Sequence, residues 1–195
     1  YLGSKGTKFV SKLPEQRKLT DGKLKKRNTF LTNNTFAQTQ ITALNLQLKE
    51  KLSQLSTIRQ QVDQQSIKAA KAIGFYTDLN KHLLQVSELI AEISSDAKIT
   101  KTTVAYYSFL QGKERAGIER AVMSNTFARD NFGPGMLVKF ITLVSEQNTY
   151  FTNFKAFAHG TNTQFFDQRL QDASVQQVAN MRKIALDNKD NGQFG

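Results

Sequence analysis

The sequence predicts an all-α fold, an elongated antiparallel bundle of long helices. Apolar residues recur at spacings of three and four along most of the chain, and no segment alternates with a period of two. Only two prolines occur, Pro14 and Pro134, as expected where most residues are helical. Long amphipathic helices joined by short turns pack as antiparallel neighbours, so we expect about six helices and no strand.

The first expected helix, residues 7–31, is strongly basic. Residues 1–27 carry nine bases and two acids, within a net charge of +11 for the whole chain. Such a charge suits an anionic partner, whether nucleic acid, a membrane surface or a small anion, although a solvated helix face is the simpler interpretation. Pro14 fits here only in the first turn or at a kink.

Two further helices are expected over residues 36–64 and 65–94. Thr35 can cap the first of them, and Ser56 with Thr57 leaves room for a break inside it. The second has the most regular pattern in the chain, a seam at alternating spacings of three and four that consists of Tyr76, Leu79, Leu83, Val86, Ile90 and Ile93. This seam predicts core packing and no chemistry.

Arg59 lies on the apolar stripe of the second helix, four residues after Leu55 and three before Val62. A guanidinium on a buried face needs an anionic partner or a path to solvent. A structural ion pair and a ligand contact therefore both remain open for Arg59.

A long helix is expected over residues 97–129, after a cap at Asp96. One of its faces starts apolar and becomes polar, and it consists of Tyr106, Leu110, Lys113, Gly117, Arg120, Ser124 and Phe127. Glycine inside a helix costs about 1 kcal/mol relative to alanine, so Gly117 needs a reason. Either another helix crosses closely there, or Gly117 opens space for a small ligand beside Arg120, with Ser124 one turn further on.

The last two expected helices span residues 136–159 and 162–188, after a loop at residues 130–135. Gln147 is the polar residue in the apolar stripe of the first of them. Its amide has two open roles, a hydrogen bond to a neighbouring backbone carbonyl or donation to a bound anion.

The composition argues against catalysis, and we expect a non-enzyme without cofactor or metal. Cysteine is absent, and the two histidines, His82 and His159, lie far apart in the sequence. Glu114 and Glu119 are five residues apart, so they point to different sides of a helix and do not form a carboxylate pair. No glycine-rich phosphate loop, metal-ligand cluster or membrane-spanning apolar run occurs.

One stretch of the long helix resembles the nitrate- and nitrite-sensing (NIT) domain of bacterial receptors. That family carries the motif Lys-Glu-x-x-Gly-x-Glu-Arg-Ala, which is filled here by Lys113, Glu114, Gly117, Glu119, Arg120 and Ala121. Weaker likeness covers nearly the whole chain and lies in Tyr1–Gly6, Gln16–Arg17, Thr20–Asp21, Leu55–Val62 and the set Gln147, Tyr150 and Phe154.

The resemblance implies two packed four-helix bundles that share long helices, in a single sensor domain over residues 1–195. Together with the residue pattern, the resemblance implies that the best ligand-binding candidates are Arg120 and Arg59. Gln147, Gly117 and Ser124 are the further candidates. Nitrate and nitrite are small planar monoanions, and guanidiniums from different helices suit their in-plane oxygens with charge-assisted hydrogen bonds. Arg182, on the apolar side of the last helix, is a weaker third candidate.

By the same resemblance, the domain is the periplasmic part of a membrane receptor such as a chemoreceptor or histidine kinase. A cytoplasmic regulator, like the family's RNA-binding antiterminator, is the less favoured alternative. Binding would pass a helix shift to a downstream signalling module in the same polypeptide, and a homodimer stays open. An Arg-Gly-(Ser/Thr) segment precedes the Tyr1 region in the family and a Trp-containing helix ends it, so we expect this chain to lack the family's outermost segments.

A second hypothesis is a helical interaction module whose basic first helix binds an acidic protein or an anionic lipid surface. Nucleic acid is the less favoured partner, because few aromatic residues lie among these bases to stack on unpaired nucleotides.

Overall fold

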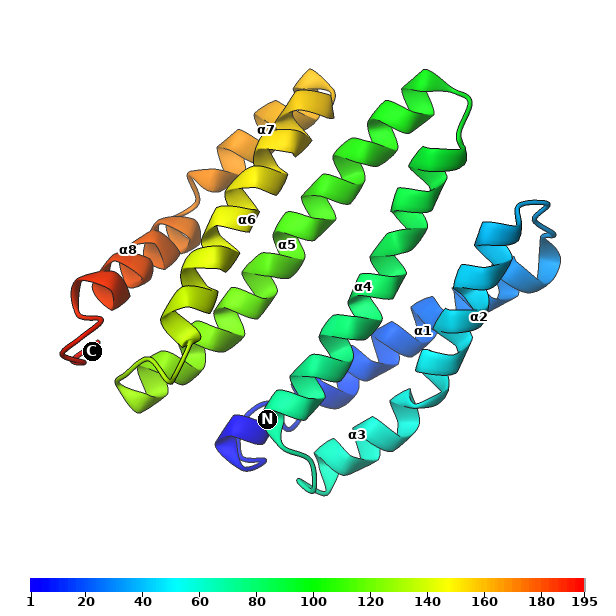
Figure 1. Cartoon of the computed structure of the whole chain (residues 1–195). Coiled ribbons are helices and arrows are strands. Elements are labelled where there is room, and N and C mark those ends of the chain that lie inside the picture. The colour runs from blue at the N-terminus through cyan, green and yellow to red at the C-terminus, as the bar shows by residue number, and fades with distance from the viewer. Residues whose placement is uncertain (195) are drawn as a thin grey trace. The chain divides into compact units, whose positions relative to one another are not determined.

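The computed structural model describes residues 1–194, and the regular structure in this range is helical (Figure 1). A 3-10 turn, η1 (Leu2–Ser4), comes first. The α-helices are α1 (Lys12–Asn33), α2 (Thr39–Ser53), α3 (Leu55–Asp63), α4 (Ala69–Ile93), α5 (Ala97–Arg129), α6 (Met136–Phe157), α7 (Gly160–Leu170) and α8 (Ala173–Asp187). The predicted all-α fold is confirmed.

The chain divides into two compact units, Tyr1–Val86 and Ser87–Gly195. The first contains α1, α2, α3 and most of α4, and the second contains the end of α4 and the helices α5 to α8. This division matches the two helical bundles that the sequence predicts, with α4 as the long helix that they share.

Two of the predicted helices are each split in two. The helix expected over residues 36–64 begins at Thr39, beyond the predicted cap, and breaks at Gln54, where α2 gives way to α3. Apolar residues keep helical spacing across this break, so the periodicity does not reveal it. The helix expected over residues 162–188 is interrupted before Asp172, which occupies the N-cap position of α8, a position that favours aspartate.

The first helix, α1, begins at Lys12, later than predicted, and this places Pro14 in the first turn, where its missing N–H costs no hydrogen bond. None of the residues of α1 is buried. Its partly buried residues recur at spacings of three and four, and they are Leu13, Arg17, Thr20, Leu24, Arg27 and Leu31. Polar contacts therefore hold α1 in place alongside apolar packing.

The core of the first unit has two apolar clusters. Their buried members are Ile58, Val62, Ile67 and Ala72 in one cluster, and Leu48, Leu55 and Leu79 in the other. From α1, Leu13 packs against the first cluster and Leu24 against the second. Burial of these side chains supplies the main driving force for the unit.

In the second unit, α5 and α6 lie side by side (Figure 1). One core cluster surrounds Phe140, which is almost fully buried. A second cluster is aromatic, with ring centroids 5.0 to 6.4 Å apart, and contains Phe109, Phe151, Phe154 and Phe166. Aromatic pairs at these separations stabilise beyond the area they bury.

Aspartates lie at both ends of α5. Asp96 accepts hydrogen bonds from the second and third backbone N–H groups of the helix, at 2.7 and 2.9 Å, as the sequence predicts. At the other end, Asp130 accepts hydrogen bonds from the backbone N–H groups of Phe194 and Gln193, at 2.7 and 2.9 Å. These two bonds hold the pKa of the Asp130 carboxyl below its ordinary value.

Of the two glycines inside α5, Gly112 lies tightly against another helix and Gly117 does not. A Cβ placed on Gly112 would lie 2.4 Å from Cε1 of Phe151 on α6. A Cβ placed on Gly117 would have no such neighbour within 4 Å. A close helix crossing therefore does not explain Gly117, which leaves open space beside α5.

Thr126 of α5 is fully buried, and its hydroxyl has no hydrogen-bond partner among residues 1–194. We expect Thr126→Val to raise the free energy of unfolding by about 1 kcal/mol in urea denaturation, because valine keeps the shape and removes an unpaired polar group. Thr102 is the matched control, since its exposed hydroxyl donates to the Lys98 carbonyl at 2.8 Å. Thr102→Val should change stability by less than about 0.5 kcal/mol. Lower stability of Thr126→Val would contradict this reading of the hydroxyl.

Candidate functional site

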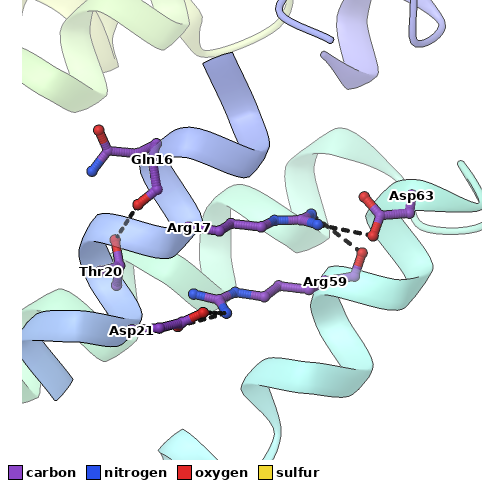
Figure 2. Close-up of polar contacts among 6 residues, drawn as sticks. All are labelled: Gln16, Arg17, Thr20, Asp21, Arg59 and Asp63. Atoms are coloured by element: carbon purple, nitrogen blue, oxygen red, sulfur yellow. Dashed lines mark hydrogen bonds and ion pairs between the residues drawn. The ribbon is translucent and has the colours of Figure 1, made fainter. Parts of the chain in front are cut away.

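Arg59 of α3 points toward α1 and binds the carboxylate of Asp21 (Figure 2). Its Nη1 donates to both oxygens, at 2.7 Å to Oδ1 and 3.0 Å to Oδ2. The Arg59 side chain is 18% exposed and the Asp21 side chain 54% exposed. Asp21 is thus the anionic partner that the position of Arg59 on an apolar stripe requires.

Arg17 of α1 makes the reciprocal ion pair (Figure 2). Its Nη1 donates to Oδ2 of Asp63 at 2.8 Å, and its Nη2 donates to the backbone carbonyl of Arg59 at 3.4 Å. Its Nε is buried and has no hydrogen-bond partner in the described part of the chain. The cluster therefore contains two guanidiniums, two carboxylates and, at Arg17 Nε, a buried donor without an acceptor in the described part of the chain.

The sequence spacing explains why the pairs cross. Each helix carries an arginine and, four residues later, an aspartate, which are Arg17 and Asp21 on α1 and Arg59 and Asp63 on α3. Residues four apart share one face of a helix. Because α1 and α3 run antiparallel here, each arginine meets the aspartate of the other helix. This shared spacing is the sequence signal that points to Asp21 as the partner of Arg59. The apolar stripe around Arg59 shows only that a partner is needed.

An open hollow runs along α1, lined by residues from Asp21 to Asn33. Lys25 also lines it. Solvent reaches the Asp21 carboxylate from this side, so the ion pair with Arg59 is accessible to small ions.

Arg120 lies on α5, in the second unit, whereas Arg59 belongs to the first. Arg120 and Ser124 are exposed, and Gly117 is half-buried. Among residues 1–194, no carboxylate forms an ion pair with Arg120. Its guanidinium can therefore bind an anion from solvent without first breaking an ion pair within the chain.

A buried polar network lies on another side of α5. Glu119 is 4% exposed. Its carboxylate accepts two hydrogen bonds from Arg182 and one from the Gln147 amide, each 2.6 Å long. Arg182 Nη2 also donates to Oε1 of Gln147 at 3.0 Å. The network joins α5, α6 and α8, and its charge-assisted hydrogen bonds compensate the burial of Glu119.

This network changes how two predicted residues are interpreted. Gln147 donates to a carboxylate and not to a backbone carbonyl, and its contact with an anion stays a prediction. Arg182, the weaker third ligand candidate, is already paired with Glu119. Glu119 does have a sequence signal, because it lies on the same face of α5 as the buried residues Val122 and Thr126 and so needs a cationic partner.

Arg115 forms a second link between α5 and α6. Its Nε donates to Oε2 of Glu146 at 3.0 Å, and its guanidinium lies 4.9 Å from the ring centroid of Tyr150. Nearby, burial and then the charges of Glu88 and Tyr150 raise the pKa of Tyr107 above its ordinary value. Tyr107 therefore stays a neutral hydrogen-bonding group at physiological pH.

The two histidines form their hydrogen bonds with other residues than the arginines described above. His82 Nδ1 is 2.8 Å from the backbone carbonyl oxygen of Asp78, and His159 Nδ1 is 3.0 Å from Oγ1 of Thr161. Over residues 1–194, no three His, Cys, Asp or Glu side chains gather in a way that could hold a metal ion. In the same range, no helix has both the length and the apolar character needed to cross a membrane.

Residues 1–195 match the protein family described as "Nitrate and nitrite sensing". The nitrate regulatory protein of Klebsiella oxytoca is 33% identical to this chain over 134 residues, which are 69% of this chain and 33% of that protein. The solved structure of the NasR transcription antiterminator has a TM-score of 0.83 and 28% identity, over 88% of this chain and 47% of that chain. The chain thus spans a third of the curated relative and about half of the solved one.

These relatives correct the predicted location. The prediction of the periplasmic part of a membrane receptor is wrong, because the similar proteins are described as a nitrate regulatory protein and a transcription antiterminator. A chemoreceptor or kinase output has no support from them either. The physical reason is that a short motif such as Lys113–Ala121 indicates a family, whereas the compartment depends on features outside that motif.

Proposed function

The chain belongs to the nitrate and nitrite sensing family, and from this premise we propose that it binds nitrate or nitrite as a sensor domain. The observation that carries the proposal is the match of the family over residues 1–195. The first unit supports it, because the Arg59 guanidinium holds a planar group with two in-plane oxygens, the carboxylate of Asp21.

In this proposal, the guanidiniums that contact anions are Arg59 in the first unit and Arg120 in the second. The in-plane oxygens of nitrate and nitrite suit the forked, charge-assisted hydrogen bonds of guanidinium. Gly117 supports the assignment because it leaves open space on α5, and Ser124 is exposed one turn beyond Arg120. Gln147 has an indirect role, because its amide holds the carboxylate that precedes Arg120 in the sequence.

The proposal extends to how the signal leaves the domain. We propose that residues 1–195 act as one sensor domain, and that binding favours one of two helix arrangements. A ligand shifts such an equilibrium only through different affinities for the two states. Because the matched relatives are longer than this chain and are a regulatory protein and an antiterminator, the proposed output is a regulatory module in the same polypeptide.

Calorimetric titration with nitrate and with nitrite, at constant ionic strength, tests the proposal. We expect saturable heat with these anions and none with chloride or sulfate. Arg120→Ala and Arg59→Ala should each weaken binding about tenfold or more, because hydrogen bonds to charged groups contribute roughly 1.5–3 kcal/mol.

Arg129→Ala is the matched control, since Arg129 is an exposed arginine on the same helix as Arg120. It should leave the affinity unchanged. An affinity that survives Arg120→Ala would remove Arg120 from the site. A steep loss of affinity with rising salt would favour the second hypothesis, a surface contact on the basic α1, because exposed charges are screened more than the largely buried guanidinium of Arg59.

A further inference from the structure

We infer that Asp21 occupies the anion position on Arg59, and that nitrate or nitrite binds Arg59 by displacing this carboxylate. The inference rests on the proposed function, because it requires that Arg59 contacts the ligand. It assigns Asp21 a role of its own, since a competing carboxylate in the same chain sets how tightly the site holds an external anion.

The contact between Arg59 and Asp21 has the form that a small planar anion would take. One guanidinium nitrogen of Arg59 donates to both carboxylate oxygens, at 2.7 and 3.0 Å. A carboxylate group is planar, carries one negative charge and presents two oxygens in its plane. Nitrite shares these three properties, and nitrate adds a third oxygen. The exchange therefore leaves the charge on Arg59 balanced and its donors bonded.

Asp21 is the partner that can leave the pair. Its side chain is 54% exposed, against 18% for Arg59. A carboxylate at the surface regains hydration when it rotates away, so Asp21 loses little when it leaves the pair. Arg59 is mostly buried and needs a replacement anion. The hollow along α1, which Asp21 and Lys25 help to line, gives that anion a path from solvent past a positive charge.

Arg17 provides an independent reason to expect an anion in this cluster. Its Nη1 is bound to Asp63 at 2.8 Å, but its buried Nε has no acceptor among the described residues. The side chains of Arg17 and Arg59 run alongside each other between α1 and α3 (Figure 2). The cluster thus has more donors than its two carboxylates use, and the three oxygens of nitrate can accept more hydrogen bonds than the two of Asp21.

Displacement of Asp21 would loosen α1. No residue of α1 is buried. Two ion pairs link it to α3, one between Arg17 and Asp63 and the other between Arg59 and Asp21. When the ligand binds Arg59 in place of Asp21, only the ion pair between Arg17 and Asp63 remains. The helix whose position responds to the ligand is therefore α1, which connects binding to a helix movement.

The test compares the nitrate affinities of Asp21→Asn and Asp63→Asn, by calorimetric titration at constant ionic strength. Both substitutions remove one negative charge from the same cluster, at side-chain exposures of 54% and 51%. Only the first removes the competitor from Arg59. We expect Asp21→Asn to tighten nitrate binding about fivefold, because a neutral amide binds guanidinium less strongly than a carboxylate, and Asp63→Asn to change it less than about twofold.

The double variant Asp21→Asn with Arg59→Ala should bind nitrate no better than Arg59→Ala alone, since the competition requires Arg59. Circular dichroism shows that each variant is folded before it is titrated. Equal or weaker nitrate binding by Asp21→Asn overturns the inference, and so does an equal gain in Asp63→Asn, which would be a general charge effect.

The proposed function and the displacement fail in different ways. If neither the unsubstituted chain nor Asp21→Asn binds nitrate or nitrite saturably, the proposed function itself is overturned. If the unsubstituted chain binds nitrate, Arg59→Ala loses that binding and Asp21→Asn leaves it unchanged, only the displacement by the ligand is overturned.

Discussion

Glu119→Gln is expected to lower the free energy of unfolding by about 3 kcal/mol, measured by urea denaturation with circular dichroism. The Glu119 side chain is 5% exposed, and its Arg182 partner is 28% exposed. Glutamine keeps the volume but removes the charge, and it places an amide N–H₂ group where donors from Arg182 and Gln147 converge. Solvent around Arg182 limits the loss to the lower end of what a broken buried pair costs.

Glu146→Gln is the control for this change. It breaks the ion pair with Arg115, which also joins α5 and α6 through a 3.0 Å hydrogen bond but has side-chain exposures of 24% for Arg115 and 44% for Glu146. Exposed pairs are worth less than about 1 kcal/mol, so this variant should stay close to the unsubstituted chain. If Glu119→Gln lost no more stability than Glu146→Gln, the hydrogen bonds of Glu119 would not stabilise the packing of α5, α6 and α8 as their geometry indicates.

Gly112→Ala is expected to lower the free energy of unfolding by about 2 kcal/mol. The added Cβ would lie 2.4 Å from Cε1 and 2.8 Å from Cδ1 of Phe151. To make room, α6 must move or the ring must rotate, and either change disturbs the contacts of Phe151 with Phe109 and Phe166, at centroid separations of 6.4 and 5.0 Å. Overpacking of this kind outweighs the roughly 1 kcal/mol that alanine gains over glycine in a helix.

Gly117→Ala is the same substitution on the same helix, with the opposite expected sign. No neighbour would meet the new Cβ. The free energy of unfolding should therefore rise by about 1 kcal/mol through helix propensity alone. If the open space serves the ligand, this more stable chain should also bind nitrate more weakly. A loss of stability in both variants would contradict the assignment of the close helix contact to Gly112.

The sequence predicts best what depends on neighbouring residues. The bounds of α5 agree with the prediction of residues 97–129, because its spacing is regular and Asp96 caps its start. The predictions for α2 and α3 are less accurate, since apolar spacing continues through the break at Gln54. The turn before α8 had a signal in Asp172, a residue that favours helix starts, but this signal is weak beside a continuous apolar pattern.

For the candidate site, too, the sequence predicts what depends on neighbouring residues and leaves open what depends on tertiary packing. The positions of Arg59 and Arg182 on apolar stripes show that each needs an anionic partner. Which carboxylate each one meets is not a local property, because Arg59 pairs with Asp21 across 38 residues and Arg182 pairs with Glu119 across 63 residues. Only the packing of α1 against α3, and of α8 against α5, brings these groups together.

By itself, the sequence determined the all-α class, the long helices and the family, because helical periodicity and the motif at Lys113–Ala121 are contained in short stretches of chain. The tertiary structure decided which glycine lies under a neighbouring ring and which arginines pair with a carboxylate. Both outcomes depend on how helices distant in sequence pack. Phe151 makes Gly112 a point of close contact while Gly117 stays open, and Asp21 pairs with Arg59 while Arg120 has no carboxylate partner among residues 1–194.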